Sequence, residues 1–170
     1  MGAFDKTICD CCVCPMECVL KQLEELSIPL VNIIDSSLMD NISNATIQAV
    51  EDFVLFTNNG NVPIHSIFSV GFDSASDPLT LKQPKNDKKG KCACIEDPAT
   101  NMLKNMIGSF AVISNTIAGT VSRVGEGILI LENAADSLGG VYDFAVVSTC
   151  LVGIVDQDLR WESRSNDPSN

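Results

Sequence analysis

A short segment of the chain occurs twice, at one constant spacing. The residues from Cys9 to Lys21 return from Cys92 to Lys104, 83 positions later. Five identical pairs define this register: Cys9/Cys92, Cys11/Cys94, Pro15/Pro98, Leu20/Leu103 and Lys21/Lys104. So many matches in one register are not expected by chance, and the sequence therefore indicates a tandem duplication of one small unit.

The repeat divides the 170 residues into five segments. We predict a cysteine-rich N-terminal arm at 1–14, a first unit at 15–73, a linker at 74–91, a second unit at 92–157 and a polar C-terminal tail at 158–170. Units of this size bury only a modest share of their surface when they fold. Each unit is therefore expected to need the other unit, a crosslink or a neighbouring subunit.

Acidic residues dominate both units, and the formal net charge of the chain is −11. Five lysines cluster in the linker and are interpreted as a solvated stretch: Lys82, Lys85, Lys88, Lys89 and Lys91. Binding to phosphate backbones depends largely on Lys and Arg side chains. Nucleic acid is therefore not an expected partner.

The sequence gives no sign of export or membrane insertion. The first 14 residues lack the basic start and the long apolar core of a secretory signal. The longest uncharged apolar run, Phe144 to Val155, is shorter than the roughly 20 residues that a bilayer requires. We therefore expect synthesis in the cytoplasm and no membrane partner.

Each unit is predicted to begin with a helix and to continue with short strands. Pro15 and Pro98 suit the first turn of a helix. Runs of β-branched residues bounded by turn residues predict strands in the second unit at 110–113, 117–124 and 127–133, and two more within 141–155. The first unit has corresponding runs at 28–34, 50–56 and 64–72. The predicted fold is mainly β with short helices, and a helix followed by about five bent antiparallel strands makes a small closed barrel.

This order of elements resembles the Sm fold of the LSm and Hfq family. The resemblance covers residues 98–157 and 15–73, with extra residues in the first unit around 36–44. It implies two tandem Sm-like barrels that pair edge strands with their neighbours to make rings or stacks. The RNA-reading turns of the family do not carry over, because this chain has Arg123-Val124-Gly125-Glu126 and Val147-Ser148-Thr149-Cys150 at those places. An Sm-like RNA-associated protein, which the resemblance implies, is for this reason kept only as an alternative prediction.

The cysteines are the densest chemical feature of the chain. Seven of them are candidates for crosslinks or metal ligands: Cys9, Cys11, Cys12, Cys14, Cys18, Cys92 and Cys94. The spacings Cys9/Cys12 and Cys11/Cys14 are typical of thiolate zinc sites, so a zinc-binding module is a second alternative. We favour crosslinking, in which an oxidised arm reaches another subunit and each bridge contributes about 2–4 kcal/mol. No cofactor is predicted apart from a possible zinc ion, and the pairing of the cysteines cannot be deduced from the sequence.

Three further residues stand out in the sequence. Cys150 lies in an apolar run and is predicted to be a buried thiol that acts as a small hydrophobic residue. His65 has no nucleophile and orienting acid beside it, so no catalytic residue and no enzymatic activity are predicted. Trp161, in the polar tail, is a candidate for docking into a groove on a neighbouring subunit.

Together these features predict a structural protein that assembles with itself through strand edges and N-terminal arms. Small barrels with open strand edges form homo-oligomers, or filaments where the contact does not close. Acidic, cysteine-rich proteins without an export signal resemble components of spore surface layers and appendages of endospore-forming bacteria. That resemblance implies a disulfide-stabilised fibre or layer at the spore or cell surface, and a cytoplasmic location is the alternative. It predicts an assembly that resists heat and detergent until reductant is added.

Overall fold

The computed structural model describes residues 9–37, 41–84 and 91–157, without the side chains of residues 9, 10 and 91. Its first half contains a π-helical turn η1 (Cys9–Val13), helix α1 (Cys14–Glu25), strands β1 (Val31–Asp35), β2 (Asn41–Ala45), β3 (Ile47–Glu51), β4 (Val54–Thr57) and β5 (Gly60–Pro63), a 3-10 turn η2 (Ile64–Ser66) and strand β6 (Ile67–Phe72). Its second half contains helices α2 (Lys91–Ile95) and α3 (Asp97–Lys104), strands β7 (Phe110–Ile113), β8 (Ile117–Gly125), β9 (Ile128–Asp136) and β10 (Val141–Ser148), a 3-10 turn η3 (Thr149–Leu151) and strand β11 (Val155–Asp156).

The two halves run through a similar order of elements with similar backbone angles. The residue before the main helix has φ −84° and ψ −49° at Val13, and φ −90° and ψ −48° at Glu96. The residue after the 3-10 turn has φ −73° and ψ 113° at Ile67, and φ −73° and ψ 115° at Val152. The first pair is 83 positions apart and the second pair 85. The backbone therefore repeats near the start and near the end of each half.

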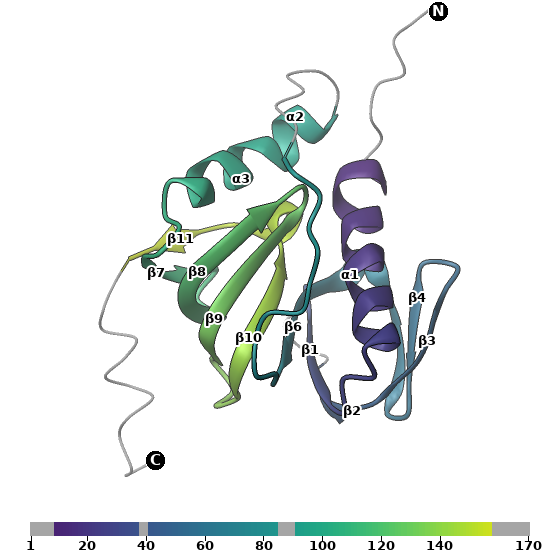
Figure 1. Ribbon diagram of the computed structural model, residues 1–170. Helices are drawn as coiled ribbons and strands as arrows, with labels where there is room; N and C mark the ends of the chain where they lie inside the picture. The colour runs from purple at the N-terminus through teal and green to yellow at the C-terminus, as the bar shows by residue number, and fades with distance from the viewer. Residues whose placement is uncertain (1–8, 38–40, 85–90, 158–170) are drawn as a thin grey trace, which may run out of the picture.

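Eight of the described strands form one antiparallel sheet, in the order β11-β7-β8-β9-β10-β6-β1-β2, and β3-β4-β5 form a second sheet (Figure 1). The last strand of each half pairs with the first strand of the same half, β6 with β1 and β11 with β7. The halves are joined where β6 pairs with β10, from Phe72 opposite Phe144 to Ser69 opposite Val147. Strand pairing is thus continuous from one half to the other.

The predicted class, mainly β with short helices, is confirmed, but two closed barrels are not observed. Among the described residues neither sheet closes on itself, because β6 and β10 extend one sheet across both halves. The first half also splits between the two sheets at Thr46. Asn44 has a left-handed φ of 52°, and the Thr46 N–H donates to the Asn58 side chain at 2.7 Å. This bend separates β2 from β3.

The central strands of the large sheet are buried on both faces. In β9, Ile128 and Ile130 belong to one hydrophobic cluster, whereas Leu129 and Leu131 belong to the other. Strands β10, β6 and β1 divide their side chains between the same two clusters. A strand with both faces covered needs a continuous apolar run instead of an alternating one, which explains the run Ile128 to Leu131.

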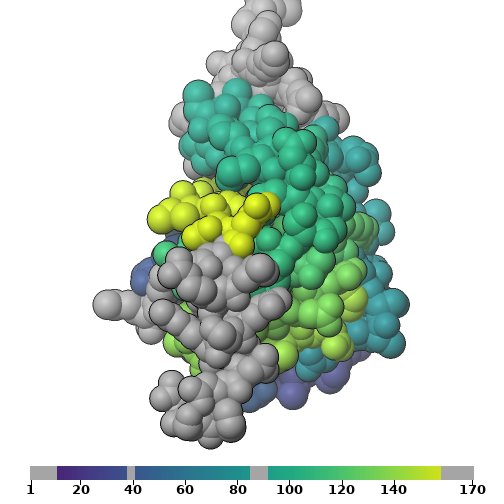
Figure 2. Space-filling view, turned by 90° about the vertical axis from the view of Figure 1, so that its left-hand side faces the viewer, coloured from purple at the N-terminus to yellow at the C-terminus, as the bar shows by residue number. Residues whose placement is uncertain are grey.

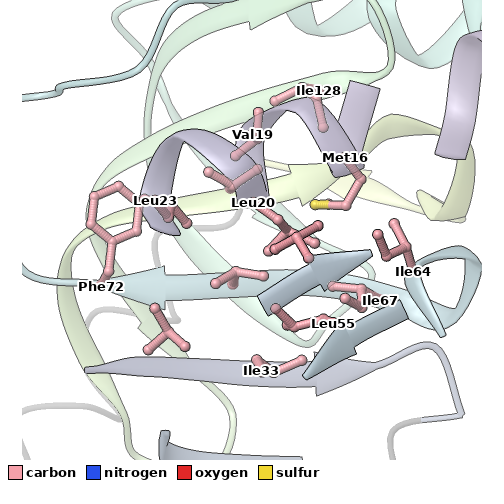
Figure 3. Packing of buried hydrophobic residues seen from close by; sticks show 14 of the residues in the cluster. Met16, Val19, Leu20, Leu23, Ile33, Leu55, Ile64, Ile67, Phe72 and Ile128 are labelled. Atoms are coloured by element: carbon pink, nitrogen blue, oxygen red, sulfur yellow. The ribbon is translucent and has the colours of Figure 1, made fainter. Parts of the chain in front are cut away.

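Helix α1 covers the cluster on the side of the first half (Figure 3). Its apolar side chains recur at helical spacing and have exposed fractions of 1% or less: Met16, Val19, Leu20 and Leu23. They pack with Leu55 and Ile67 of the first half and with Ile128 of the second. This shared core means that α1 stabilises the junction of the halves as well as its own unit.

Part of the predicted linker packs against both halves. The Arg123 Nε donates to Asp77 at 2.7 Å, and the Arg123 guanidinium also donates to the Leu79 carbonyl at 2.6 Å. Thr80 exchanges two hydrogen bonds with the Gln22 side chain of α1, at 2.7 and 3.0 Å. Residues 77–80 are therefore held by contacts to β8 and to α1.

Candidate functional site: a four-cysteine centre

Four cysteines from both halves meet at one end of the molecule. Cys11 and Cys12 come from η1, Cys92 from α2 and Cys150 from η3. Two disulfides join them, Cys11–Cys92 with a Cα–Cα distance of 5.9 Å and Cys12–Cys150 with one of 5.7 Å. We call these four residues the four-cysteine centre. Both bridges connect the start of the first half to the second half within one chain.

Three of the seven predicted crosslink or metal candidates belong to this centre: Cys11, Cys12 and Cys92. The others do not take part in its bridges. Cys14 and Cys18 lie on α1, and Cys18 and Cys94 are exposed and form no disulfide within the described residues. The side chain of Cys9 and the whole of Trp161 lie outside the described residues.

The structure corrects one expectation about the cysteines. Cys150, predicted to be a buried inert thiol, is half-buried and disulfide-bonded, because the chain leaves β10 and turns through η3 towards η1. The two described bridges of the arm lie within one chain. That the arm also reaches another subunit stays a prediction. The second half offers partners close at hand, since η1 packs against η3.

The turn that carries Cys11 and Cys12 rests on a glycine of the second half. Gly127, in the β8–β9 turn, has a left-handed φ of 72°. A Cβ added to it would lie 2.1 Å from the Cys11 carbonyl oxygen and 2.9 Å from Pro15 Cγ. Only a residue without a side chain lets the backbone of η1 approach this closely. Gly127 therefore fixes the position from which Cys11 and Cys12 reach their partners.

A buried polar network ties the same elements together. Glu96 is 3% exposed, and its Oε1 accepts a hydrogen bond from the Gly127 N–H at 2.9 Å and another from the Thr100 hydroxyl. The Thr100 hydroxyl lies 3.3 Å from that of Thr149, whose N–H donates to the Gly127 carbonyl at 3.0 Å. The network links α3, the β8–β9 turn and η3 without using sulfur.

Burial of Glu96 changes its acidity. Loss of hydration raises the pKa of the Glu96 carboxyl, and the hydrogen bonds from Thr100 and Gly127 offset part of that effect. Sequence reasoning missed this residue. The only signal was its place beside Asp97-Pro98 at the start of a helix, where an acidic residue is common on surface helices.

Other candidate residues lie apart from the centre. His65 is exposed in η2, a 3-10 turn and not a strand. Arg123, which the Sm resemblance would place at an RNA-reading turn, lies in β8 and is engaged with Asp77 and Leu79. Within the described part of the chain, no helix combines the length and apolar character needed to cross a membrane.

Comparisons with known proteins place no constraint on this site. The chain matches no protein-family model, and neither a curated protein nor a solved structure is significantly similar to it. Its chemistry must therefore be judged from the arrangement itself. The two disulfides span 81 and 138 residues of sequence. They restrict the conformations of the unfolded chain, which favours the folded state.

Proposed function

We propose that this chain is a structural protein that assembles with copies of itself through strand edges. The observation that carries the proposal is the pairing of β6 with β10, which joins two halves of similar construction. We further propose that the halves are two Sm-like units. In this proposal the contact inside the chain is repeated between chains.

The strands that correspond to β6 and β10 lie at sheet edges. By their positions next to the 3-10 turns, β6 corresponds to β11, and β10 corresponds to β5. Among the described residues β11 pairs with β7 alone, and β5 pairs with β4 alone. Figure 2 shows the end of the described chain, in yellow, at the surface on the side of the molecule where β11 lies. An exposed strand edge is a template for pairing with another chain.

The internal pairing predicts the register between chains. The 3-10 turns begin at Ile64 and Thr149, so residues around them correspond at an offset of 85. The β6–β10 ladder contains the pairs Ser69/Val147, Val70/Val146 and Gly71/Ala145. Adding 85 to each β6 residue and subtracting 85 from each β10 residue gives three predicted pairs between copies: Ile154/Val62, Val155/Asn61 and Asp156/Gly60. Ile154 is 58% exposed and is therefore accessible to a partner strand. Pro63, which lacks an N–H, falls just outside the predicted pairs.

Charge and contacts favour a structural role over RNA binding. The net charge of −11 opposes binding to phosphate. Arg123 is held by the Asp77 carboxylate and the Leu79 carbonyl, so its guanidinium already has partners within the chain. The proposed product is a disulfide-containing fibre or surface layer, associated with a spore or cell surface. In such an assembly the exposed thiols of Cys18 and Cys94 are available for further bridges between copies.

A disulfide introduced between chains tests the proposal. Cys12 forms a disulfide with Cys150. The counterpart of Cys12 in the second half is Ile95, at the offset of 83 found near the helices, and the counterpart of Cys150 in the first half is His65, at the offset of 85 found near the 3-10 turns. Both counterparts are exposed, Ile95 by 39%. The variant Ile95→Cys/His65→Cys, with Cys18→Ser and Cys94→Ser to remove the exposed native thiols, should form a ladder of linked multimers on a non-reducing gel. Tryptic peptides should contain a 65–95 bridge between chains.

A matched control uses a cysteine at an exposed turn. Leu138 is 64% exposed and lies between β9 and β10, away from the predicted contact. The variant Leu138→Cys/His65→Cys in the same background should give no ladder. Equal ladders in the two variants, or a monomer of the native chain at micromolar concentration by light scattering, would contradict assembly through these edges.

A further inference from the structure

The sulfur atoms of the four-cysteine centre are close enough to share one metal ion. The Sγ atoms of Cys11, Cys12 and Cys150 all lie within 4.8 Å of one another. Cys92 Sγ is bonded to Cys11 Sγ, so it belongs to the same group. The Sγ atoms of Cys11 and Cys12, which are not bonded to each other, are 3.7 Å apart. That separation matches the edge of roughly 3.8 Å expected for a tetrahedron with zinc–sulfur bonds of about 2.3 Å.

We propose that, when both disulfides are reduced, Cys11, Cys12, Cys92 and Cys150 bind one zinc ion as four thiolates. The set differs from the C-x2-C pairs of the arm, because it takes two ligands from the first half and two from the second. Zinc favours tetrahedral thiolate sites of this kind in structural roles. The centre then holds the halves together in either redox state, and this inference does not depend on self-assembly.

The redox change balances with a dithiol and a disulfide as partners. Two equivalents of a dithiol reduce the two protein disulfides and become two cyclic disulfides, which gives four protein thiols. Zinc then binds the four sulfurs and displaces their four protons. In the reverse direction, two small disulfides and four protons convert the zinc-bound form to two protein disulfides, four small thiols and free zinc.

The surroundings of the centre do not depend on the disulfides. Cys11 and Cys92 are 1% and 3% exposed, Cys12 is 8% exposed and Cys150 is half-buried, so a bound ion is largely shielded from water. The contact of Gly127 with η1 and the hydrogen bonds of Glu96, Thr100 and Thr149 position the elements without sulfur. Reduction therefore leaves the four thiols near one another, which lowers the cost of assembling a metal site.

Metal titration of the full chain tests the inference. Native protein is reduced anaerobically with excess dithiol, desalted and titrated with zinc against a chromogenic chelator. We expect one tightly bound zinc per reduced chain and none per oxidised chain. Cobalt(II) in place of zinc should give the absorption bands of a tetrahedral thiolate site. Treating the zinc-loaded protein with a small disulfide should release one zinc as four protein thiols disappear and four small thiols form, a result that needs no variant.

Variants identify the ligands. Cys150→Ser and Cys92→Ser should each lose tight zinc binding, with circular dichroism used to confirm that each variant is folded. The matched control Cys18→Ser/Cys94→Ser should still bind one zinc, because neither residue belongs to the centre. Absence of zinc binding by the reduced native chain would overturn the inference. So would unchanged binding in Cys150→Ser, or a loss in the control equal to that in Cys150→Ser.

Discussion

The first and second halves share their order of elements but build it differently. Strands β8, β9 and β10 of the second half have nine, nine and eight residues, and all three lie in the large sheet. The corresponding part of the first half is broken into strands of four or five residues, and three of them form a separate sheet. In compensation, α1 has twelve residues, whereas α3 has eight.

This difference shows that helix packing replaces strand length in the first half. The apolar face of α1 fills a cluster that β1, β4 and β6 share with side chains from the second half (Figure 3). The second half places its longer strands between two clusters and needs less from its helix. The same order of elements is therefore compatible with a core filled mainly by a helix, as in the first half, and with a core filled mainly by long strands, as in the second. The four-cysteine centre is a second asymmetry, because it fastens η3 of the second half and has no cysteine at η2.

The first prediction removes the disulfide at η3, which has no counterpart at η2. The double variant Cys12→Ser/Cys150→Ser should lower the free energy of unfolding by about 2–5 kcal/mol, because the bridge closes a long loop in the unfolded chain. Chemical denaturation under non-reducing conditions measures the change. Cys18→Ser, at an exposed site on α1, is the control and should unfold like the native chain. Equal stability of the double variant and the control would show that the bridge does not secure the junction.

The second prediction compares the turns that precede β4 and β9. The first half has Phe53 with a φ of 62°, whereas the second half has Gly127 with a φ of 72° beneath η1. Gly127→Ala should cost about 2–4 kcal/mol, because it adds both left-handed strain and an overlap with the Cys11 carbonyl. Thermal or denaturant unfolding measures the loss.

Gly139→Ala separates the two contributions. Gly139 also has a left-handed φ, 92°, but nothing lies within 4 Å of an added Cβ. Its substitution should cost only the backbone strain, about 1 kcal/mol. If the two alanine variants lose the same stability, the close contact between η1 and Gly127 does not contribute to the cost of the Gly127 substitution.

The third and smallest prediction concerns the acid at the start of α3. Position 96 is Glu in the second half, and its counterpart in the first half is Val13. Because burial raises the pKa of the Glu96 carboxyl, the folded chain binds its proton more tightly than the unfolded chain does. The stability that this proton contributes is fully present below the unfolded pKa of about 4.3 and is lost as pH rises through the folded pKa.

Replacing the acid by its amide should remove this dependence. Melting temperatures of Glu96→Gln, measured from pH 4 to pH 7, should fall less with rising pH than those of the native chain. Glu25→Gln removes a carboxylate from an exposed site on α1 and is the matched control. A native-like slope in Glu96→Gln would mean that another group causes the pH dependence.

Much of the local structure could be predicted from the sequence. The repeat around Pro15 and Pro98 located both helices, since a proline in the first turn and the following apolar stripe are local signals. The strand runs at 110–113, 117–124 and 127–133 correspond to β7, β8 and β9. These elements depend on residues close in sequence, so their pattern was sufficient.

Features that depend on distant contacts were not predicted. Nothing near Cys150 in sequence indicates that η3 will turn towards η1, 138 residues away from its partner Cys12. The same holds for the pairing of β6 with β10, which replaces two closed barrels by one continuous sheet. Glu96 was missed because its partner Gly127 lies on another element, the β8–β9 turn, 31 residues further along the chain.

Electron cryo-microscopy of the assembled protein tests the central claim most directly. The account predicts particles in which β5 of one copy lies antiparallel to β11 of the next, with Val62 opposite Ile154 and Asn61 opposite Val155. The junction between copies should then superimpose on the β6–β10 junction within each chain. Particles joined through other surfaces, with the outer edges of β5 and β11 left without a strand partner, would contradict it.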